Sequence, residues 1–296
     1  MRLTLLFVLS LCTCVHALVA QSPDYNFDSP ILIGELPAEL DEISGLSMAP
    51  GNRGELLVVQ DEAGKVFRIN TQTGGLLWST TFWKDGDYEG VEAVGNDIWV
   101  VKNTGTLYQI SNPGQVNQKV EKFNTVLTSD NDVEGLTYDP TKNRLLLACK
   151  KDAKDDGNDK DGRYIFAFDL ATKTLGENPA FAIEREAVER FLASCPKTKK
   201  HDKLCSFFVK KDEFDLSPSA IAIHPITGQL FITSSVGKVM MVLNPNGQIA
   251  YLHKLDKDFF PQPEGLAFEA DGTLFISTEK KKDQPARVYR LPRIVR

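Results

Sequence analysis

The sequence predicts an all-β fold, a five-bladed β-propeller, and three observations lead to this prediction. Five segments of the chain resemble one another at the spacing of propeller blades. Each of them is followed by further short strands. A lone strand precedes the first repeat, whereas the last repeat has no room for a fourth strand.

Each repeat opens with a polar pair, a glycine or alanine, and an apolar stretch. The openings are Glu-Ile-Ser-Gly-Leu at Glu42, Asp-Tyr-Glu-Gly-Val at Asp87, Asp-Val-Glu-Gly-Leu at Asp132, Ser-Pro-Ser-Ala-Ile at Ser217 and Gln-Pro-Glu-Gly-Leu at Gln262. Their small residues are Gly45, Gly90, Gly135, Ala220 and Gly265. These lie about 45 residues apart, the length of one blade, except for one interval of about 85. We therefore expect blades to start near residues 42, 87, 132, 217 and 262.

Branched and aromatic residues then predict a second and a third strand in every repeat. The second strands are expected at 56–59, 98–101, 145–148, 230–233 and 274–277, and the third at 66–69, 106–110, 164–168, 239–243 and 288–291. The segment Ile31 to Leu36 reads as a strand that completes the last blade and closes the ring. Closure would hide an edge that otherwise invites pairing with another molecule, so we expect a monomer.

The long third interval could contain either a sixth, degenerate blade or an insertion. The insertion is favoured, because Glu184 to Ala193 has a helical pattern and a loop bounded by cysteines follows it. We place this partly helical insertion at residues 184–206 of a single domain that spans residues 21–296, and we expect its cysteine-bounded loop to be a surface excursion.

The N-terminus is typical of a secretory signal peptide over residues 1–20. Arg2 precedes an apolar run from Leu3 to Leu18, and small residues follow it. This run is too short to span a bilayer comfortably, and no later segment could do so. The protein is therefore expected to be exported, whether to the periplasm, the cell surface or the medium. A lipid anchor at Cys12 or Cys14 is less favoured, because Leu11 and Thr13 make a poor lipoprotein signal.

An oxidising compartment would favour a disulfide between Cys195 and Cys205 and leave Cys149 as a small buried core residue. The formal net charge is −6, and Lys and Arg are scattered except at Lys280 to Lys282. Nucleic acid is therefore not an expected partner.

Polar residues gather where blades start, because the innermost strand begins, and the second strand ends, at the same mouth of the central channel. Directly before the small residues stand Ser44, Glu89, Glu134, Ser219 and Glu264, and two positions earlier stand Glu42, Asp87, Asp132, Ser217 and Gln262. The second strands end near Asp61, Lys102, Asn103, Lys150, Ser235 and Glu279. Carboxylates held this close repel each other, which raises their pKa values or requires a cation. An oxygen-only ligand set suits Ca²⁺, although Lys102 and Lys150 could neutralise the ring instead.

These blade starts, together with Pro-Glu-Gly-Leu-Ala at Pro263, resemble the SdiA-regulated propellers, distant relatives of NHL-repeat proteins. The resemblance covers nearly all the mature chain and implies a five-bladed propeller with bound calcium and no established activity. Glu42, Glu89, Glu134 and Glu264 are the metal ligands we expect. The cysteine-containing stretch from Glu184 to Phe208 departs from a minimal member of the family.

Two functions agree with these features. The first is a binding module whose mouth takes a small molecule, a glycan or another envelope protein. The alternative is a calcium-dependent hydrolase of a lactone, ester or phosphate ester, by analogy with propellers that hold calcium among mouth carboxylates. Its candidate proton-transfer groups are Lys102, Lys150, Asp61 and Glu279. The sequence contains no Gly-x-Ser-x-Gly elbow, His-Glu-x-x-His helix or glycine-rich phosphate loop.

Overall fold

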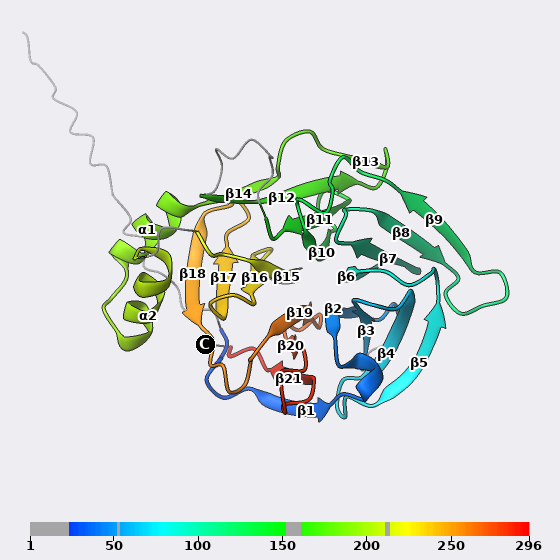
Figure 1. Cartoon of the computed structure of the whole chain (residues 1–296), viewed down its shortest axis with the longest axis horizontal. Coiled ribbons are helices and arrows are strands. Elements are labelled where there is room, and N and C mark those ends of the chain that lie inside the picture. The colour runs from blue at the N-terminus through cyan, green and yellow to red at the C-terminus, as the bar shows by residue number, and fades with distance from the viewer. Residues whose placement is uncertain (1–23, 52–53, 152–160, 211–213, 296) are drawn as a thin grey trace, which may run out of the picture.

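The chain forms five antiparallel sheets arranged radially around a central channel (Figure 1). The computed structural model describes residues 24–51, 54–151, 161–210 and 214–295. The predicted signal peptide, with Cys12 and Cys14, lies outside these residues. Within them the five-bladed propeller is confirmed, and no sixth blade occurs in the long third interval.

The blades follow one another in chain order, and each runs outward from the channel. Blade 1 contains β2 (Ile43–Met48), β3 (Glu55–Gln60), β4 (Lys65–Asn70) and β5 (Leu76–Thr81), preceded by the 3-10 helix η1 (Ala38–Leu40). Blade 2 contains β6 (Tyr88–Val94), β7 (Asp97–Lys102), β8 (Leu107–Ser111) and β9 (Lys119–Phe123). Blade 3 contains β10 (Val133–Asp139), β11 (Arg144–Cys149) and β12 (Gly162–Asp169), with β13 (Thr174–Leu175) and β14 (Phe181–Glu184) both paired to β12.

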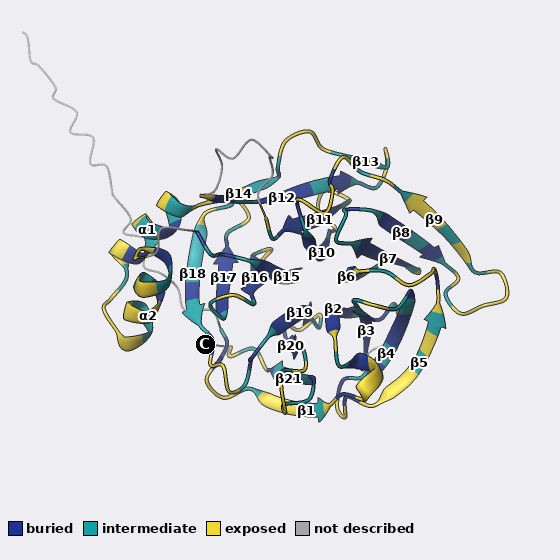
Figure 2. Ribbon diagram, in the orientation of Figure 1, coloured by how far each residue is buried: buried dark blue, intermediate teal, exposed yellow. Residues whose placement is uncertain are grey.

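The remaining two blades complete the ring. Blade 4 contains β15 (Pro218–Ile223), β16 (Leu230–Ser234), β17 (Val239–Leu243) and β18 (Ile249–Lys254). Blade 5 contains β19 (Pro263–Phe268), β20 (Leu274–Thr278) and β21 (Arg287–Leu291), with β1 (Ile31–Glu35) as its outermost strand. Burial decreases from the inner strands to the outer ones, as Figure 2 shows, because only the inner strands have a neighbouring blade on both faces.

The small residue of each repeat is required by the approach of neighbouring inner strands. A Cβ added at Gly45 would lie 2.9 Å from the Cα of Gly90, and one at Gly90 would lie 3.0 Å from the backbone nitrogen of Leu136. A Cβ at Gly265 would lie 2.7 Å from the Cβ of Leu46, which belongs to blade 1. Only a small residue permits this spacing, so the repeat reflects how closely the blades pack around the channel.

The predicted closure by the N-terminal strand is confirmed. β1 pairs antiparallel with β21, from Ile31 opposite Arg290 to Glu35 opposite Arg287. An ion pair of 2.8 Å joins the side chains of Arg287 and Glu35. The segment before β1 contributes more than the sequence indicated, because Tyr25 and Phe27 are buried in the core shared by blades 4 and 5.

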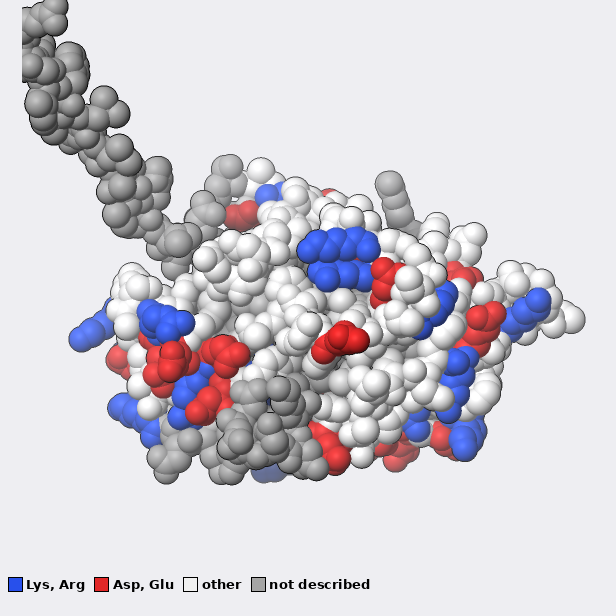
Figure 3. Space-filling model, turned by 90° about the horizontal axis from the view of Figure 1, so that it is seen from above, with Lys and Arg blue, Asp and Glu red and all other residues white. Residues whose placement is uncertain are grey.

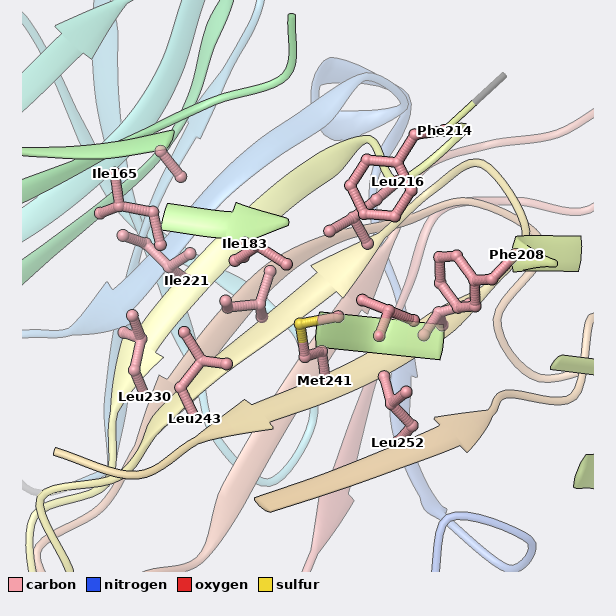
Figure 4. Close-up of a cluster of buried hydrophobic side chains, with 14 of the residues drawn as sticks. Ile165, Ile183, Phe208, Phe214, Leu216, Ile221, Leu230, Met241, Leu243 and Leu252 are labelled. Carbon is pink, nitrogen blue, oxygen red and sulfur yellow. The ribbon is translucent and has the colours of Figure 1, made fainter. Parts of the chain in front are cut away.

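The insertion consists of two helices, α1 (Arg185–Ser194) and α2 (Lys199–Phe208), between β14 and β15. The predicted insertion is therefore confirmed, but its cysteine-bounded loop runs into a second helix, α2, whose inner face is buried rather than on the surface. Val188, Leu192, Leu204 and Phe208 are buried and join the core cluster of blade 4, which Figure 4 shows with Met241 and Leu252. Both helices are amphipathic, so they cover apolar side chains that the outer strand of blade 4 would otherwise expose to solvent.

The three described cysteines are free thiols in this structure. Cys195 lies at the end of α1 and Cys205 within α2, where its Sγ is 3.5 Å from Nε2 of His201. Burial, and to a smaller extent the nearby Cys205, raise the pKa of Cys195. The two thiols are thus neighbours, and their disulfide stays a prediction.

The surface and the helices bear on the expected partners. Neither described helix has the length and apolarity needed to cross a membrane. On the edge of the molecule seen in Figure 3, positive and negative side chains are interspersed among uncharged ones.

We predict that Phe27→Ala lowers the free energy of unfolding by about 3–5 kcal/mol, because it empties a buried site between two blades. Phe27 is 2% exposed, whereas Leu32, on β1, is 48% exposed. The matched change Leu32→Ala should cost about 1 kcal/mol or less. Denaturant unfolding of both variants makes the comparison. Equal losses of unfolding free energy in the two variants would contradict the buried position of Phe27 between blades 4 and 5.

Candidate functional site at the channel mouth

A β-bulge at the start of every inner strand turns one side chain toward the channel. The pairing register shifts between Ile43 and Gly45, and it shifts at the equivalent place in the other four blades. The extra residues are Ser44, Glu89, Glu134, Ser219 and Glu264. A bulge re-aims a side chain locally. The sequence predicted these residues as a ring, and the bulges are the structural reason for it.

The ring encloses a small cavity. Ser44, Glu89, Glu134 and Glu264 line it together with apolar residues of the inner strands. Its volume is about 10 Å³, which corresponds to one water molecule or one ion. Ser219 is fully buried, and its hydroxyl donates to the carbonyl oxygen of Pro263 at 2.6 Å. The polar groups that remain inside the ring are therefore mainly three glutamates.

One lysine neutralises one of these glutamates. Lys150 Nζ lies 2.7 Å from Oε1 of Glu134. Lys102, the other lysine expected to neutralise the ring, instead places its ammonium over the ring of Tyr88, 5.6 Å from the centroid. The neutralisation predicted as an alternative to a metal is thus observed for Lys150 and not for Lys102.

The remaining ring carboxyls are held in an environment that opposes their ionisation. Burial, followed by the charges of Glu134 and Asp61, raises the pKa of Glu89 to about 9. Burial and the neighbouring charges of Glu134 and Glu279 raise the pKa of Glu264 well above its ordinary value. Burial also raises the pKa of Glu134, although Lys150 opposes this shift.

A second tier of side chains lies above the ring, where second strands end beside blade starts. The same backbone hydrogen bond positions them in four blades: Asp61 to Glu42, Asn103 to Asp87, Lys150 to Asp132 and Glu279 to Gln262, each from a nitrogen to a carbonyl oxygen. In blade 4 the Ser217 nitrogen donates to the hydroxyl of Ser234, and the carbonyl of Ser235 accepts from Lys238. The predicted convergence of these positions is thus observed.

The second tier is partly paired. Asn103 donates to Asp87 at 2.7 Å, Lys151 lies 3.1 Å from Asp132, and Gln262 donates to Glu279. Burial and the adjacent Glu42 raise the pKa of Asp61 to about 7. Burial, with Asp61 and Glu42, also raises the pKa of Glu279 to about 7.

Two oxygens at the mouth are suited to a cation. Oδ1 of Asp61 and Oδ1 of Asn103 are buried, and neither has a hydrogen-bond partner among the described residues. Such atoms are costly unless something pairs with them. Among the described residues, no three His, Cys, Asp or Glu side chains lie close enough together to hold a metal ion as they stand. The oxygens at the mouth are of the chemical type that a hard cation prefers, but the side chains would have to move closer to hold one.

The opposite end of the channel shows how a buried glutamate can be satisfied by the protein. Glu92 accepts hydrogen bonds from the hydroxyl of Ser47 at 2.6 Å and from the backbone nitrogens of Ala93 and Tyr138 at 3.0 and 3.1 Å. These donors come from three blades, so Glu92 ties them together. Glu89 and Glu264 have no comparable set of donors, which distinguishes the mouth from the rest of the channel.

A model of the SdiA-regulated family matches residues 23–155 and 187–292. No curated protein matches the sequence significantly. Glutaminyl cyclase of Myxococcus xanthus is similar in structure, with a TM-score of 0.56, 13% identity, and coverage of 89% of this chain and 95% of that one. At this identity the likeness shows the fold alone.

Two further structures are more distant. Streptogramin B lyase has a TM-score of 0.45 and 14% identity, and the match covers 87% of this chain and 67% of the lyase. A nidogen/laminin complex has a TM-score of 0.46 and 14% identity, with coverage of 80% and 72%.

We predict that, in chelator, the protein loses stability as the pH rises from 7 to 9. Glu89 keeps its proton in the folded state up to a pKa of about 9, whereas the unfolded chain has lost it above 4.5. Between these two pKa values the folded state holds one more proton than the unfolded chain, so the free energy of unfolding falls as the pH rises. Ordinary carboxyls have finished titrating at pH 7, and ordinary histidines finish within the lower part of this interval.

Glu89→Gln should flatten this dependence, and Glu177→Gln, at an exposed position, should leave it unchanged. Melting temperatures measured at several pH values in this interval test the prediction. An equally steep fall in the Glu89→Gln protein would contradict it.

Proposed function

Since the chain belongs to the SdiA-regulated family, whose members share a propeller fold without an established activity, we propose that it is an exported calcium-binding protein whose channel mouth binds a ligand. The observation that carries the proposal is the excess of carboxyl groups over positive charges at the mouth. Glu42, Asp61, Glu89, Glu264 and Glu279 crowd together without an ion pair among the described residues, beside two unpaired buried oxygens.

Glu89 and Asp61 are the residues best suited to hold the ion, with Asn103 Oδ1 and Glu42 beside them. Their charges already act on one another, and an oxygen set of carboxylates and an amide is what Ca²⁺ prefers. Glu264 and Glu279 lie close enough to add their charge. Glu134 is the least available of the expected ligands, because Lys150 already binds it. When bound, calcium would supply a positive charge and open positions for oxygen atoms of a ligand.

The ligand would be a small molecule, a glycan or another envelope protein, and the protein would act as a monomer. Export rests on the signal peptide predicted over residues 1–20. In an oxidising compartment we propose that Cys195 and Cys205 form a disulfide, which their proximity favours.

A calcium-dependent hydrolase is a second candidate, and one observation favours it. The pKa values of Asp61 and Glu279 are raised to about 7, which is where a proton-transfer group works best at neutral pH. Perturbed carboxyls of this kind gather at catalytic sites as well as at ion sites. The substrate would be a lactone, an ester or a phosphate ester.

We predict that calcium raises the melting temperature of the wild-type protein and that chelator lowers it, because an ion that binds only the folded state stabilises it by mass action. Glu89→Gln removes one charge without changing the side-chain shape and should weaken calcium binding by about tenfold or more. Calorimetric titration of the stripped proteins gives the affinities.

Glu177→Gln is the matched control, since this side chain is exposed and lies outside the mouth. It should bind calcium as the wild type does. If the wild type shows no heat of calcium binding and its melting temperature does not change with chelator, the proposals of a calcium site and of a calcium-dependent hydrolase are both wrong.

If the hydrolase reading is correct, a panel of lactones, esters and phosphate esters will contain a substrate that is turned over with calcium and not with chelator. Glu279→Gln, at the candidate acid or base that we do not place among the calcium ligands, should lower that turnover by about 100-fold or more while calcium still binds. Calcium binding without turnover of any panel member would favour the binding module.

A further inference from the structure

A second polar site lies beside the mouth, between blades 4 and 5. The residues that line this cavity of about 540 Å³ are Lys238, Lys257, Asp258, Pro261, Lys281, Lys282, Asp283 and Gln284. They come from the hairpin between β16 and β17, the connection from β18 to β19, and the hairpin between β20 and β21. We call this cavity the lysine pocket.

The lysines of the lysine pocket outnumber its two carboxylates, Asp258 and Asp283, and are not in close ion pairs with them. None of its four lysines forms an ion pair within the part of the chain that the structure describes. Lys238 Nζ donates to the carbonyl oxygen of Ser235 at 2.9 Å, and Lys281 Nζ donates to that of Pro261 at 3.4 Å. Both ammonium groups are therefore fixed by neutral backbone atoms.

Two of these ammonium groups also adjoin one another. Burial and the neighbouring ammonium of Lys281 lower the pKa of Lys238. Like charges placed together without a counterion destabilise a folded protein. An anion between them would reverse the sign of this interaction.

The pocket offers a neutral donor as well. Oε1 of Gln284 is buried and has no hydrogen-bond partner among the described residues. Because an amide can turn to exchange its oxygen and nitrogen, the same side chain can present its NH₂ group to an anion. The amide then gains the partner that it lacks.

We propose that the lysine pocket binds the phosphate group of a small anionic ligand. Four lysines against Asp258 and Asp283 leave an excess of positive charge that matches a dianion. A phosphate accepts hydrogen bonds from several directions, which suits ammonium groups that approach from three separate loops. The cavity lies in the size range of small-molecule sites, so the rest of the ligand fits beside the phosphate.

The pocket borders the mouth. The charge of Glu264 acts on Lys238, and the charge of Lys281 acts on Glu279. A phosphorylated ligand seated on the lysines therefore extends toward the carboxylates. Phosphate binding here needs no metal, so this proposal does not rest on the calcium site.

The test is titration of inorganic phosphate into the stripped protein in chelator, followed by calorimetry and by the melting temperature. Wild type should bind phosphate and melt at a higher temperature with it. Lys238→Met combined with Lys281→Met should weaken binding by about tenfold or more. Lys122→Met, at an exposed position on β9, is the matched control and should bind as the wild type does.

The stability of the protein without phosphate is a second readout. It distinguishes lysines that bind a ligand from lysines that stabilise the fold. Without phosphate the double variant should be at least as stable as the wild type, because the substitutions remove two like charges. Sulfate should compete with phosphate, whereas acetate, a monoanion, should not. The proposal is overturned if the wild type binds no phosphate, if the double variant binds it equally well, or if that variant is markedly less stable without it.

Discussion

The structure depends on the close approach of five inner strands around one axis. Gly45, Gly90 and Gly265 leave no room for a Cβ against the next blade, and each follows a bulged residue. The two features act together. The small residue lets the strands approach, and the bulge turns a side chain into the space where they meet. The ring of polar residues at the mouth is thus a consequence of how the blades pack. Its chemistry is set by which amino acid occupies the bulge in each blade.

The two ends of the channel surround their glutamates with different partners. Burial raises the pKa of Glu92, but its carboxyl accepts hydrogen bonds from a hydroxyl and two backbone nitrogens of three blades, so it needs no ligand. At the mouth, Lys150 forms an ion pair with Glu134 and only partly offsets the raised pKa values of Glu89 and Glu264. A protein that needed these side chains only for packing would be more stable with apolar residues in their place. This is why we propose that the mouth carboxylates are kept for binding a ligand rather than for packing.

The fold could be predicted because the sequence repeat has the length of a propeller blade. The closing strand could be predicted because the last repeat lacks a fourth strand and a lone strand precedes the first repeat. The mouth residues were predictable for the same reason, since equivalent positions in a repeat meet at one place. Which of Lys102 and Lys150 pairs with a mouth carboxylate could not be predicted, because it depends on which side chain turns inward at the end of its second strand. The lysine pocket was also beyond sequence reasoning: Lys238 and Lys281 belong to different blades, and only the packing of two hairpins brings them together.

Closure by β1 has a consequence for how the chain reaches this fold. The outermost strand of blade 5 is near the beginning of the chain, and its partner β21 is near the end, so the contact spans almost the entire sequence. Contacts of such long range slow folding, because the chain must lose much entropy before they form. The first strand has no partner until the last one has been synthesised. Blades 1 to 4 can form in turn, but the ring closes only once β21 has been synthesised and pairs with β1. Until then the open strand edges are exposed to aggregation.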